Sequence, residues 1–437
     1  MQYEYNPEEK PNMKIIPKAL VFACTAAMSV GSAWAQDTTK LLVWGDAPRE
    51  PFYKSFDESR DDVELEFVSI ARNELIQKLQ LAIRSGDGVP DVIFMPDVNM
   101  AAQLSTRRSN YLMEISDKVD AGITDGFYPT SLAPCEKDGG SLVCLRNDVA
   151  HFMLWYNAPL MDELGLSVPA TWEEYEAVGK AAAANDSGIV SGAAAMHIPL
   201  MNFLYSNGCD LAVPVEGDSE TLNINATAPQ CVEAAQLVDR MLDNGSLARV
   251  APFDPEFIEL AKSGKLLMIP GPTWFGEFII KRRYEFAEGV TGVGMTPKWA
   301  SQDEPLAWSW GGGVWGAWKD TEHPDVVIDL LTFVTTDIDT NRDAVTMPAY
   351  QPASVEWGAG FDSSGYYSGD SNFPTMVDAA ANGHPGYVSL RVDTRASFTK
   401  AVVNDLAAGA SFESLLPQLQ EEFVNAAKLA RYKVITE

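Results

Sequence analysis

Basic residues are scarce in this sequence. It contains 32 lysines and arginines against 61 aspartates and glutamates, and its formal net charge at pH 7 is −29. Nucleic acids and anionic membrane surfaces are bound through clusters of Lys and Arg. The chain lacks the charge that such partners require, so no nucleic-acid or membrane-surface partner is expected. The composition favours a freely diffusing protein, which we expect to be a monomer.

Histidine is also scarce, and the common enzyme motifs are absent. The four histidines are scattered, at His151, His197, His323 and His384. The sequence has no His-Glu-x-x-His zinc motif and no Gly-x-Ser-x-Gly nucleophile motif. It has no Cys-x-x-Cys pair that could hold zinc. We therefore expect no catalytic residue, no metal site and no cofactor.

One glycine-rich stretch imitates a nucleotide-binding motif. Residues 311–316, GGGVWG, match Gly-x-Gly-x-x-Gly. The residues that follow alternate as in a strand, whereas the dinucleotide motif must open a helix. The many acidic residues leave a glycosidase carboxylate pair as an alternative. We interpret them instead as a solvated surface.

The N-terminus is typical of an exported protein. Lys14 and Lys18 precede a short apolar run at residues 19–30, and Ala33-Trp34-Ala35 precedes Gln36. A basic region, a short apolar region and small residues before a cleavage point describe a secretory signal peptide. We expect cleavage near Ala35 and Gln36 and a periplasmic protein. Removal of residues 1–35 takes away three lysines and three glutamates, so the net charge stays at −29.

Four cysteines remain after that cleavage. Cys135 and Cys144 flank Asp138-Gly139-Gly140, which is a hairpin turn signal. A hairpin would bring this pair together, and Cys209 with Cys231 would close a second loop. An even number of cysteines in an exported protein favours disulfides. Four buried free thiols are the alternative.

The pattern of apolar residues predicts an α/β fold. Residues 40–44, 63–68 and 92–95 are typical of strands, and residues 51–57 and 73–85 of helices. This alternation indicates parallel α/β layers. About 400 mature residues suffice for two or three domains. Further strands are expected at 151–156, 265–269 and 289–296, and further helices at 159–164, 173–184, 229–244, 256–262, 324–335 and across 397–432.

Three details of the second half refine this prediction. Thr171 followed by Glu174 is a capping box that opens the helix at 173–184. Residues 347–352 are expected to be an extended link, and residues 366–375 a loop. Without any long flexible linker, the domains are expected to be interleaved.

Tryptophans gather near the ends of the expected strands or in loops. Flat aromatic faces stack on the C–H faces of sugar rings, while carboxylates and amides bind the hydroxyls. A single tryptophan more often packs in a core or a loop, so only their clustering favours a sugar site. The residues concerned are Trp44, Trp155, Trp274, Trp308, Trp310 and Trp357.

Several stretches, taken in order, resemble the extracytoplasmic solute-binding proteins of ATP-binding-cassette importers, in the maltose and carbohydrate branch. They are LLVWG at 41–45, GVPDVIF at 88–94, LWYN at 154–157, PATWEE at 169–174, SGKLLMIP with GPTW at 263–274, and SWGGG at 309–313. No single motif is specific, but their order and spacing are. The resemblance spans nearly all of the mature chain.

The resemblance implies a two-lobed fold with the ligand in a cleft and hinge crossovers between the lobes. Lobe one would comprise residues 37–148 and 308–347, and lobe two residues 149–307 and 348–437. The lobes would close on a small carbohydrate and present it to a membrane permease. No covalent chemistry is implied. The ligand-binding positions carried over are Trp44, Asp46, Asp97, Asn99, Asp148, His151, His197, Asn202, Trp274, Trp310, Gly312 and Gln351.

Two departures from the maltose-binding pattern restrict the class of ligand that is expected. Met95 stands where an aromatic residue is common, and Ala150 where an acid occurs. A mono- or disaccharide, or another small polyol, is therefore expected. Asp46, Asp97 and Asp148, without an obvious arginine cluster, favour a neutral ligand over an acidic one. The alternatives are the same fold with a polyamine or an organic anion, and a secreted glycoside hydrolase.

Overall fold

The computed structural model describes residues 38–436, apart from 107–108, 138–139, 186–187, 210, 370 and 385–387. The expected signal peptide of residues 1–35, and Asp138 and Gly139 of the expected hairpin turn, lie outside the described residues. Among the described helices, none combines the length and apolarity needed to cross a membrane.

A five-stranded sheet has the strand order β2-β1-β3-β10-β4. Strands β1, β2 and β3 run parallel, and β10 is antiparallel to β3 and to β4. Strand β3 is wholly buried, as a central strand of an α/β sheet must be. The strands are β1 (Thr39–Gly45), β2 (Val63–Ser69), β3 (Val92–Met95), β4 (Leu145–Arg146) and β10 (Val314–Ala317).

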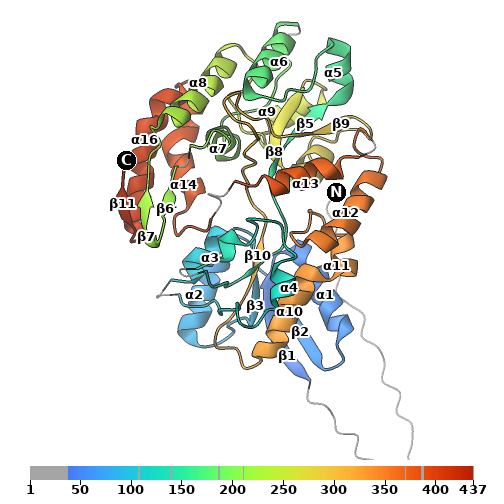
Figure 1. Cartoon of the computed structure of the whole chain (residues 1–437), viewed down its shortest axis with the longest axis vertical. Helices are drawn as coiled ribbons and strands as arrows, with labels where there is room; N and C mark the ends of the chain where they lie inside the picture. Colours follow the sequence, from blue (N-terminus) through green and yellow to red (C-terminus); the bar gives the residue numbers. More distant parts are fainter. Residues whose placement is uncertain are drawn as a thin grey trace, which may run out of the picture. The chain divides into compact units, whose positions relative to one another are not determined.

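Helices pack around this sheet in the lower part of the molecule as drawn in Figure 1. Helix α1 packs against β2 and α10, and α10 packs against β10. The elements of this group are η1 (Ala47–Arg49), α1 (Glu50–Ser59), α2 (Leu75–Ser85), α3 (Asn99–Leu104), α4 (Ala121–Thr124), η2 (Ala133–Cys135), α10 (Pro324–Thr336) and α11 (Ile338–Arg342).

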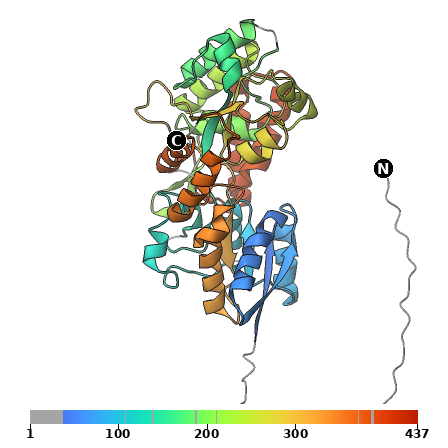
Figure 2. The ribbon, with the colours of Figure 1, turned by 90° about the vertical axis from the view of Figure 1, so that its right-hand side faces the viewer.

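A second sheet, of order β8-β5-β9, lies toward the other end in both views (Figures 1 and 2). Its strands are antiparallel, so the expected parallel layering holds for β1 to β3 of the first sheet but not here. A third sheet has the order β11-β7-β6. The strands are β5 (Phe152–Asn157), β6 (Val213–Val215), β7 (Asp218–Asn223), β8 (Met268–Pro272), β9 (Thr291–Met295) and β11 (Lys433–Ile435).

Most of the remaining helices pack with these two smaller sheets or with one another, and α12 packs against α11 and α13. Helix α16 packs against α8 and β11, and α7 packs against α8. Their bounds are α5 (Ala158–Leu164), α6 (Trp172–Asn185), α7 (His197–Tyr205), α8 (Pro229–Asp243), α9 (Pro255–Lys262), η3 (Gly276–Lys281), α12 (Gln351–Ser363), α13 (Phe373–Ala381), α14 (Thr394–Phe398), η4 (Thr399–Val403), α15 (Asn404–Ala407) and α16 (Phe412–Leu429).

Three extended segments lie side by side and connect the first sheet to the second. Residues 147–151 hydrogen-bond to residues 347–349 through Val149 N to Met347 O and Ala349 N to Asn147 O. The same segment pairs with residues 308–313 through Trp310 N to Ala150 O. Within the described residues, the chain therefore passes between its first and second sheets three times, through these neighbouring extended segments.

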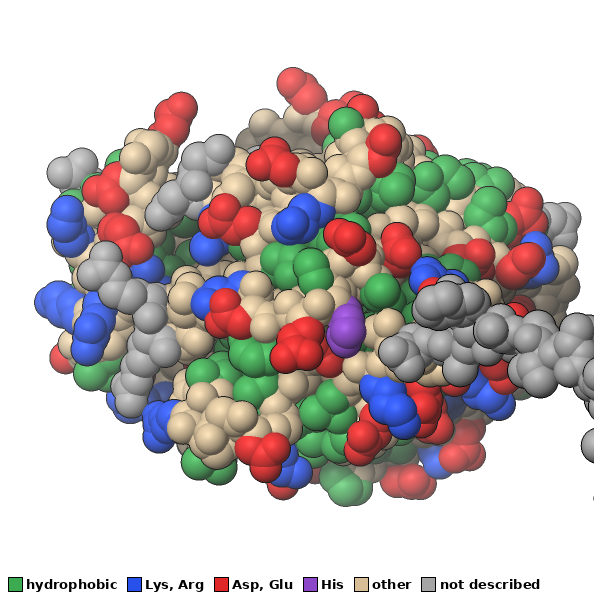
Figure 3. Space-filling view, turned by 90° about the horizontal axis from the view of Figure 1, so that it is seen from below, with side chains coloured by type: hydrophobic (Ala, Val, Ile, Leu, Met, Phe, Trp, Pro, Cys, Tyr) green, Lys and Arg blue, Asp and Glu red, His purple; other side chains and the backbone are tan. Residues whose placement is uncertain are grey.

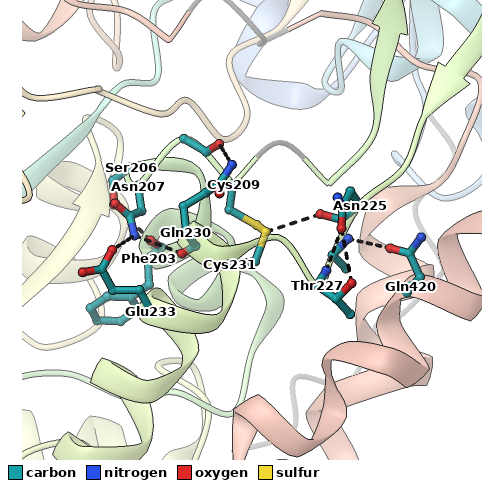
Figure 4. The surroundings of a disulfide bond; sticks show 12 residues. Phe203, Ser206, Asn207, Cys209, Asn225, Thr227, Gln230, Cys231, Glu233 and Gln420 are labelled. Carbon is teal, nitrogen blue, oxygen red and sulfur yellow. Dashed lines mark hydrogen bonds between the residues drawn. A yellow bond between two sulfur atoms is a disulfide. The ribbon is translucent and has the colours of Figure 1, made fainter. Parts of the chain in front are cut away.

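Both expected disulfides are present, Cys135–Cys144 and Cys209–Cys231. The second disulfide joins Cys209, shortly after the end of α7, to Cys231 in the first turn of α8 (Figure 4). Asn207 strengthens the same junction, because its Nδ2 donates to Gln230 O and to Glu233 Oε2, both at 2.9 Å. The end of α7 is thus fixed to α8.

Most expected elements are confirmed, the strand expected at 265–269 lies three residues later as β8, and two helix boundaries are wrong for one reason. The capping box forms, with Glu174 N donating to Thr171 Oγ1 at 3.1 Å. However, α12 begins inside the expected link, and α13 inside the expected loop. Pro352 and Pro374 occupy the first turns of these helices, where proline loses no hydrogen bond. Each proline therefore lies where a helix starts, inside a stretch that was expected to be non-helical.

The acidic residues are spread over the surface together with basic ones. In the space-filling view from below, red and blue side chains are interspersed (Figure 3). Several are paired on the surface, including Lys40 with Glu64 at 2.8 Å and Arg60 with Asp62 at 2.7 Å. This arrangement agrees with the interpretation of the acids as a solvated surface.

Candidate functional site

A cavity of about 360 Å³ lies where the loops after β1, β2 and β3 meet the crossover segments. In open α/β sheets, ligands bind at the carboxyl ends of the parallel strands, and this cavity has that position. Its other wall comes from the start of α7, from the loop after β8, from η3 and from α14. Segments from both ends of the chain therefore build one site.

Eight of the twelve expected ligand-binding residues line this cavity. They come from six separate parts of the sequence and meet only in the folded chain. These residues are Asp46, Asp97, Asn99, Asp148, His197, Trp274, Trp310 and Gly312.

The other four expected residues do not line the cavity. Trp44 packs into the apolar core around β1 and β3. Gln351 begins α12, and its Nε2 donates to Phe127 O at 2.8 Å. His151 is buried at the start of the second sheet, beside Gly383. Asn202 is fully buried on α7, and its side-chain atoms have no hydrogen-bond partner among the described residues.

Two tryptophans and a histidine form one wall. The Trp274 Nε1–H donates to Trp310 O at 2.8 Å, which fixes the orientation of the indole. The His197 ring packs edge-on against Trp310, with 4.8 Å between the ring centroids. Phe253 and Phe278 extend this wall. The half-buried indoles present flat apolar faces of the kind that stack on sugar rings.

The glycine-rich loop is held by Asp148. Gly313 N donates to Asp148 Oδ1 at 2.8 Å, and Asn147 Nδ2 donates to the same oxygen at 2.8 Å. Arg146 Nε donates to Asp148 O at 2.8 Å. Asp148 is thus a structural anchor of the crossover as well as part of the cavity wall.

Gly312 could not be another residue in this loop. Its φ is +68°, in the left-handed region that favours glycine. A Cβ there would lie 2.3 Å from Arg146 Nη2 and 2.6 Å from Asp148 O. The sequence GGG at 311–313 therefore folds as a close-packed loop and not as a nucleotide-binding turn, and β10 follows it.

Several polar atoms in the cavity wall have no partner among the described residues. They are Asp46 Oδ1, Arg49 Nε and His197 Nε2. Burial raises the pKa of Asp46, and the nearby Arg49 opposes that rise. Burial, with Arg395 and Arg72, lowers the pKa of His197 to about 3, so its ring is neutral. Buried polar groups in proteins normally find partners, and these atoms offer hydrogen bonds to a polar ligand.

The structure corrects one expectation about charge, because arginines do gather at this site. Arg49, Arg72 and Arg395 line the cavity. Arg72 Nη2 lies 2.6 Å from Asp97 Oδ2, and Arg49 Nη2 lies 3.9 Å from Asp148 Oδ1. These arginines are far apart in the sequence, so no cluster is visible before folding. Arg49 and Arg72 do each follow a predicted strand, which is the signal that could have found them.

The aromatic residues Phe253 and Phe278 were also missed, since neither lies in a stretch that carries the family resemblance. Among the described residues, no group of three or more His, Cys, Asp or Glu side chains is placed to hold a metal ion. The site is thus built from aromatic rings, carboxylates and guanidinium groups.

The whole fold resembles that of known sugar-binding proteins. The galacto-N-biose-/lacto-N-biose I-binding protein of the ABC transporter from Bifidobacterium longum, in complex with lacto-N-biose, matches with a TM-score of 0.75 and 17% identity, over 91% of this chain and 99% of that chain. The sugar-binding protein MalE from Xanthomonas citri matches with a TM-score of 0.72 and 14% identity, over 90% and 97%.

A third solved structure gives the same result. The ABC transporter associated binding protein from B. animalis subsp. lactis Bl-04, in complex with beta-1,6-galactobiose, matches with a TM-score of 0.72 and 16% identity, over 92% of this chain and 100% of that chain. At these identities the likeness concerns the fold, which is the two-lobed α/β fold expected from the sequence. No curated protein sequence matches this chain.

A family model supplies the assignment. The model for bacterial extracellular solute-binding proteins matches residues 39–340, which is more than half of the chain. This match confirms the resemblance found in the sequence. The chain belongs to the bacterial extracellular solute-binding protein family.

Proposed function

We propose that this protein is the exported substrate-binding component of an ABC importer, and that it captures a small carbohydrate in the cavity between its lobes. One observation carries the proposal. The aromatic wall of Trp274 and Trp310 stands in the same cavity as the unpartnered oxygen of Asp46. Stacking faces combined with hydrogen-bonding groups suit a ring that carries hydroxyls.

The size of the cavity supports a small ligand. Pockets for small molecules span about 300 to 1,000 Å³, and this cavity of about 360 Å³ is near the lower limit. A mono- or disaccharide fits this size better than a long oligosaccharide does. The proteins solved with lacto-N-biose and with beta-1,6-galactobiose have disaccharide ligands. The proposed binding residues are the eight expected residues that line the cavity, joined by Arg49, Arg72, Phe253 and Arg395.

The proposed lobes are residues 37–148 with 308–347, and residues 149–307 with 348–437. The pairing of β10 with β3 supports this division, because β10 belongs to residues 308–347 and β3 to residues 37–148. The three neighbouring crossover segments at 147–151, 308–313 and 347–349 would act as the hinge. Closure about such a hinge would bury the ligand and give the permease a loaded form to recognise. The expected signal peptide places this event in the periplasm.

The charges of the wall disfavour a polyamine. A polyamine site needs an excess of acids, whereas Arg49, Arg72 and Arg395 stand beside Asp46, Asp97 and Asp148. A hydrolase needs two free carboxyl groups on either side of the scissile bond. Here Asp97 pairs with Arg72, and Asp148 anchors the glycine-rich loop. Binding without catalysis is the function that we propose.

A thermal-shift screen of the mature protein tests the proposal. A ligand that binds the folded state raises the apparent unfolding temperature. We expect shifts with mono- or disaccharides and none with spermidine or putrescine. Calorimetry then gives the affinity, and incubation followed by chromatography shows the sugar unchanged. A shift with polyamines alone, or turnover of the sugar, would contradict the proposal.

A further inference from the structure

The cavity wall carries a different charge from the rest of the molecule. The chain as a whole has nearly two acids for each base. Among the described residues, the charged side chains that line the cavity are three arginines and three aspartates, with no lysine and no glutamate. Arg146 lies directly behind the wall, with its Nη2 donating to Gly311 O at 3.0 Å. Counting Arg146, the site has four guanidinium groups against three carboxylates.

Two of the three carboxylates in the wall are already engaged by neighbouring groups. Asp148 accepts from Gly313 N and Asn147 Nδ2 and lies near Arg49. Asp97 pairs with Arg72 and also accepts from Asn99 N at 3.0 Å. Asp46 keeps one buried oxygen without a partner among the described residues, and the nearby Arg49 acts on its carboxylate. Two of the three carboxylates are therefore engaged, and the third lies near a guanidinium group.

Arg395 is the arginine of the cavity wall whose guanidinium group has no partner among the described residues. It lies on α14 and lines the cavity from the side opposite Arg72. Among the described residues its guanidinium group forms no hydrogen bond and no ion pair, and the residue is exposed. After burial, which is the main cause, Arg395 and Arg72 also lower the pKa of His197, so both positive charges act at the start of α7.

The start of α7 adds to this positive charge. Helix α7 begins at His197, and both His197 and Ile198 line the cavity. The residue before the helix, Met196, provides no side-chain cap. A helix N-terminus carries a partial positive charge on its free N–H groups and favours an anion. Two guanidinium groups and a helix N-terminus thus act on one part of the cavity.

We propose that the carbohydrate bound here carries one carboxylate, as a uronic acid does, and that Arg395 with Arg72 and the start of α7 recognises it. The inference rests on the proposed function and adds the chemical class of the sugar. A planar guanidinium matches a carboxylate through two parallel hydrogen bonds. The excess of about one positive charge suits a monoanion better than a phosphate, which carries about −1.5 to −2 at pH 7.

Calorimetry on the mature protein tests this class of ligand. The probes are galacturonate and glucuronate, with galactose, glucose and galactose 1-phosphate for comparison. We expect a uronate to bind about tenfold or more tightly than its hexose, since hydrogen bonds to charged groups are stronger than neutral ones. Its affinity should fall as salt is raised, while that of the hexose stays nearly constant.

A pair of variants assigns the effect to Arg395. Arg395→Gln should weaken uronate binding about tenfold or more and leave hexose binding within about twofold. Arg84→Gln, on the exposed face of α2, removes the same charge away from the cavity and should change neither affinity. Because Arg395 is exposed and unpaired among the described residues, its variant should melt at the wild-type temperature.

The other possible results of these experiments contradict different parts of the proposal. Hexose binding as tight as uronate binding, or equal behaviour of the two variants, would overturn the acidic ligand and leave the proposed function standing. Tighter binding of galactose 1-phosphate than of galacturonate would overturn the monoanion. If none of these sugars and no other carbohydrate binds, the proposed function fails and the acidic ligand with it.

Discussion

The Ser389 hydroxyl donates to the Val98 carbonyl oxygen at 2.6 Å, across 291 residues of sequence. The same hydroxyl accepts from Ala102 N at 2.9 Å, and Leu390 N donates to Asn99 Oδ1 at 2.9 Å. We call these three hydrogen bonds the Ser389 latch. Helix α3 packs with the core of the first sheet, whereas Leu390 packs with α16 and α8. The latch therefore joins the two ends of the chain beside the cavity.

Replacing Ser389 with alanine should loosen this connection. The change removes two hydrogen bonds, each contributing about 1 kcal/mol. If the latch helps hold the lobes around the ligand, sugar affinity should fall by up to about tenfold. Calorimetry measures the affinity, and small-angle scattering measures the radius of gyration. Ser363→Ala removes an exposed hydroxyl on α12 and serves as the control. Unchanged or higher affinity in Ser389→Ala would show that the latch does not support binding.

Trp274→Ala should weaken sugar binding by about tenfold to a hundredfold while the protein stays folded. The indole supplies a stacking face in the cavity wall, and buried aromatic anchors often contribute about 2 kcal/mol or more to binding. Trp274→Phe should retain part of the affinity, because it keeps an aromatic face but loses the hydrogen bond to Trp310 O.

A control for this change is available in the same chain. Trp318 is half-buried like Trp274, but it packs against the core of the first sheet and does not line the cavity. Trp318→Ala should lower the melting temperature and leave affinity nearly unchanged. Equal affinity loss in the two alanine variants would mean that Trp274 acts through folding and not through contact with the sugar.

Gly312→Ala should damage the site. The new Cβ would overlap Arg146 Nη2 and Asp148 O, and the φ of +68° strains any side chain. We expect a loss of about 1 to 3 kcal/mol in the free energy of unfolding and a large loss of sugar affinity. Gly360→Ala is the control, because Gly360 lies in α12 with open space around it. There alanine should be neutral or stabilising by up to about 1 kcal/mol. Urea unfolding compares the two variants.

The Cys209–Cys231 disulfide should stabilise the protein more than Cys135–Cys144 does. The separations are 22 and 9 residues, and closing a longer loop removes more entropy from the unfolded chain. Replacing both Cys209 and Cys231 with serine should cost about 3 kcal/mol, and the other pair about 1 kcal/mol less. Urea unfolding measures both, and thiol labelling of the folded wild type should find no reactive cysteine among these four.

Local signals in the sequence allowed the prediction of most elements, and the family resemblance allowed the prediction of eight cavity residues. Apolar periodicity marked β1 to β3, and the order of short motifs indicated the fold. The arginines of the site were not found, since Arg72 and Arg395 meet only through the topology. Trp44 was expected in the cleft because it ends a strand. Its side chain packs into a core whose other members come from later segments.

Stability should fall as the pH is lowered from 7 toward 4, and buried histidines are the reason. Burial lowers the pKa of His151 and His197 to about 3 and that of His384 to about 4. In the unfolded chain these groups titrate near 6.5. Between these values the unfolded state binds more protons, so the free energy of unfolding decreases with falling pH. The raised pKa of Asp46 acts in the opposite direction, near pH 4.

The size of the effect can be measured on one histidine. At pH 5 each of the three groups should cost about 2 kcal/mol relative to its contribution above pH 7. His384 packs edge-on against Trp308, with ring centroids 5.3 Å apart, and phenylalanine can keep that contact without a titrating group. Urea unfolding at pH 7.5 and 5.0 should show a clear loss of stability in the wild type. The loss should be about a third smaller in His384→Phe. Equal stability of the wild type at both pH values would show that these histidines are not buried in neutral form.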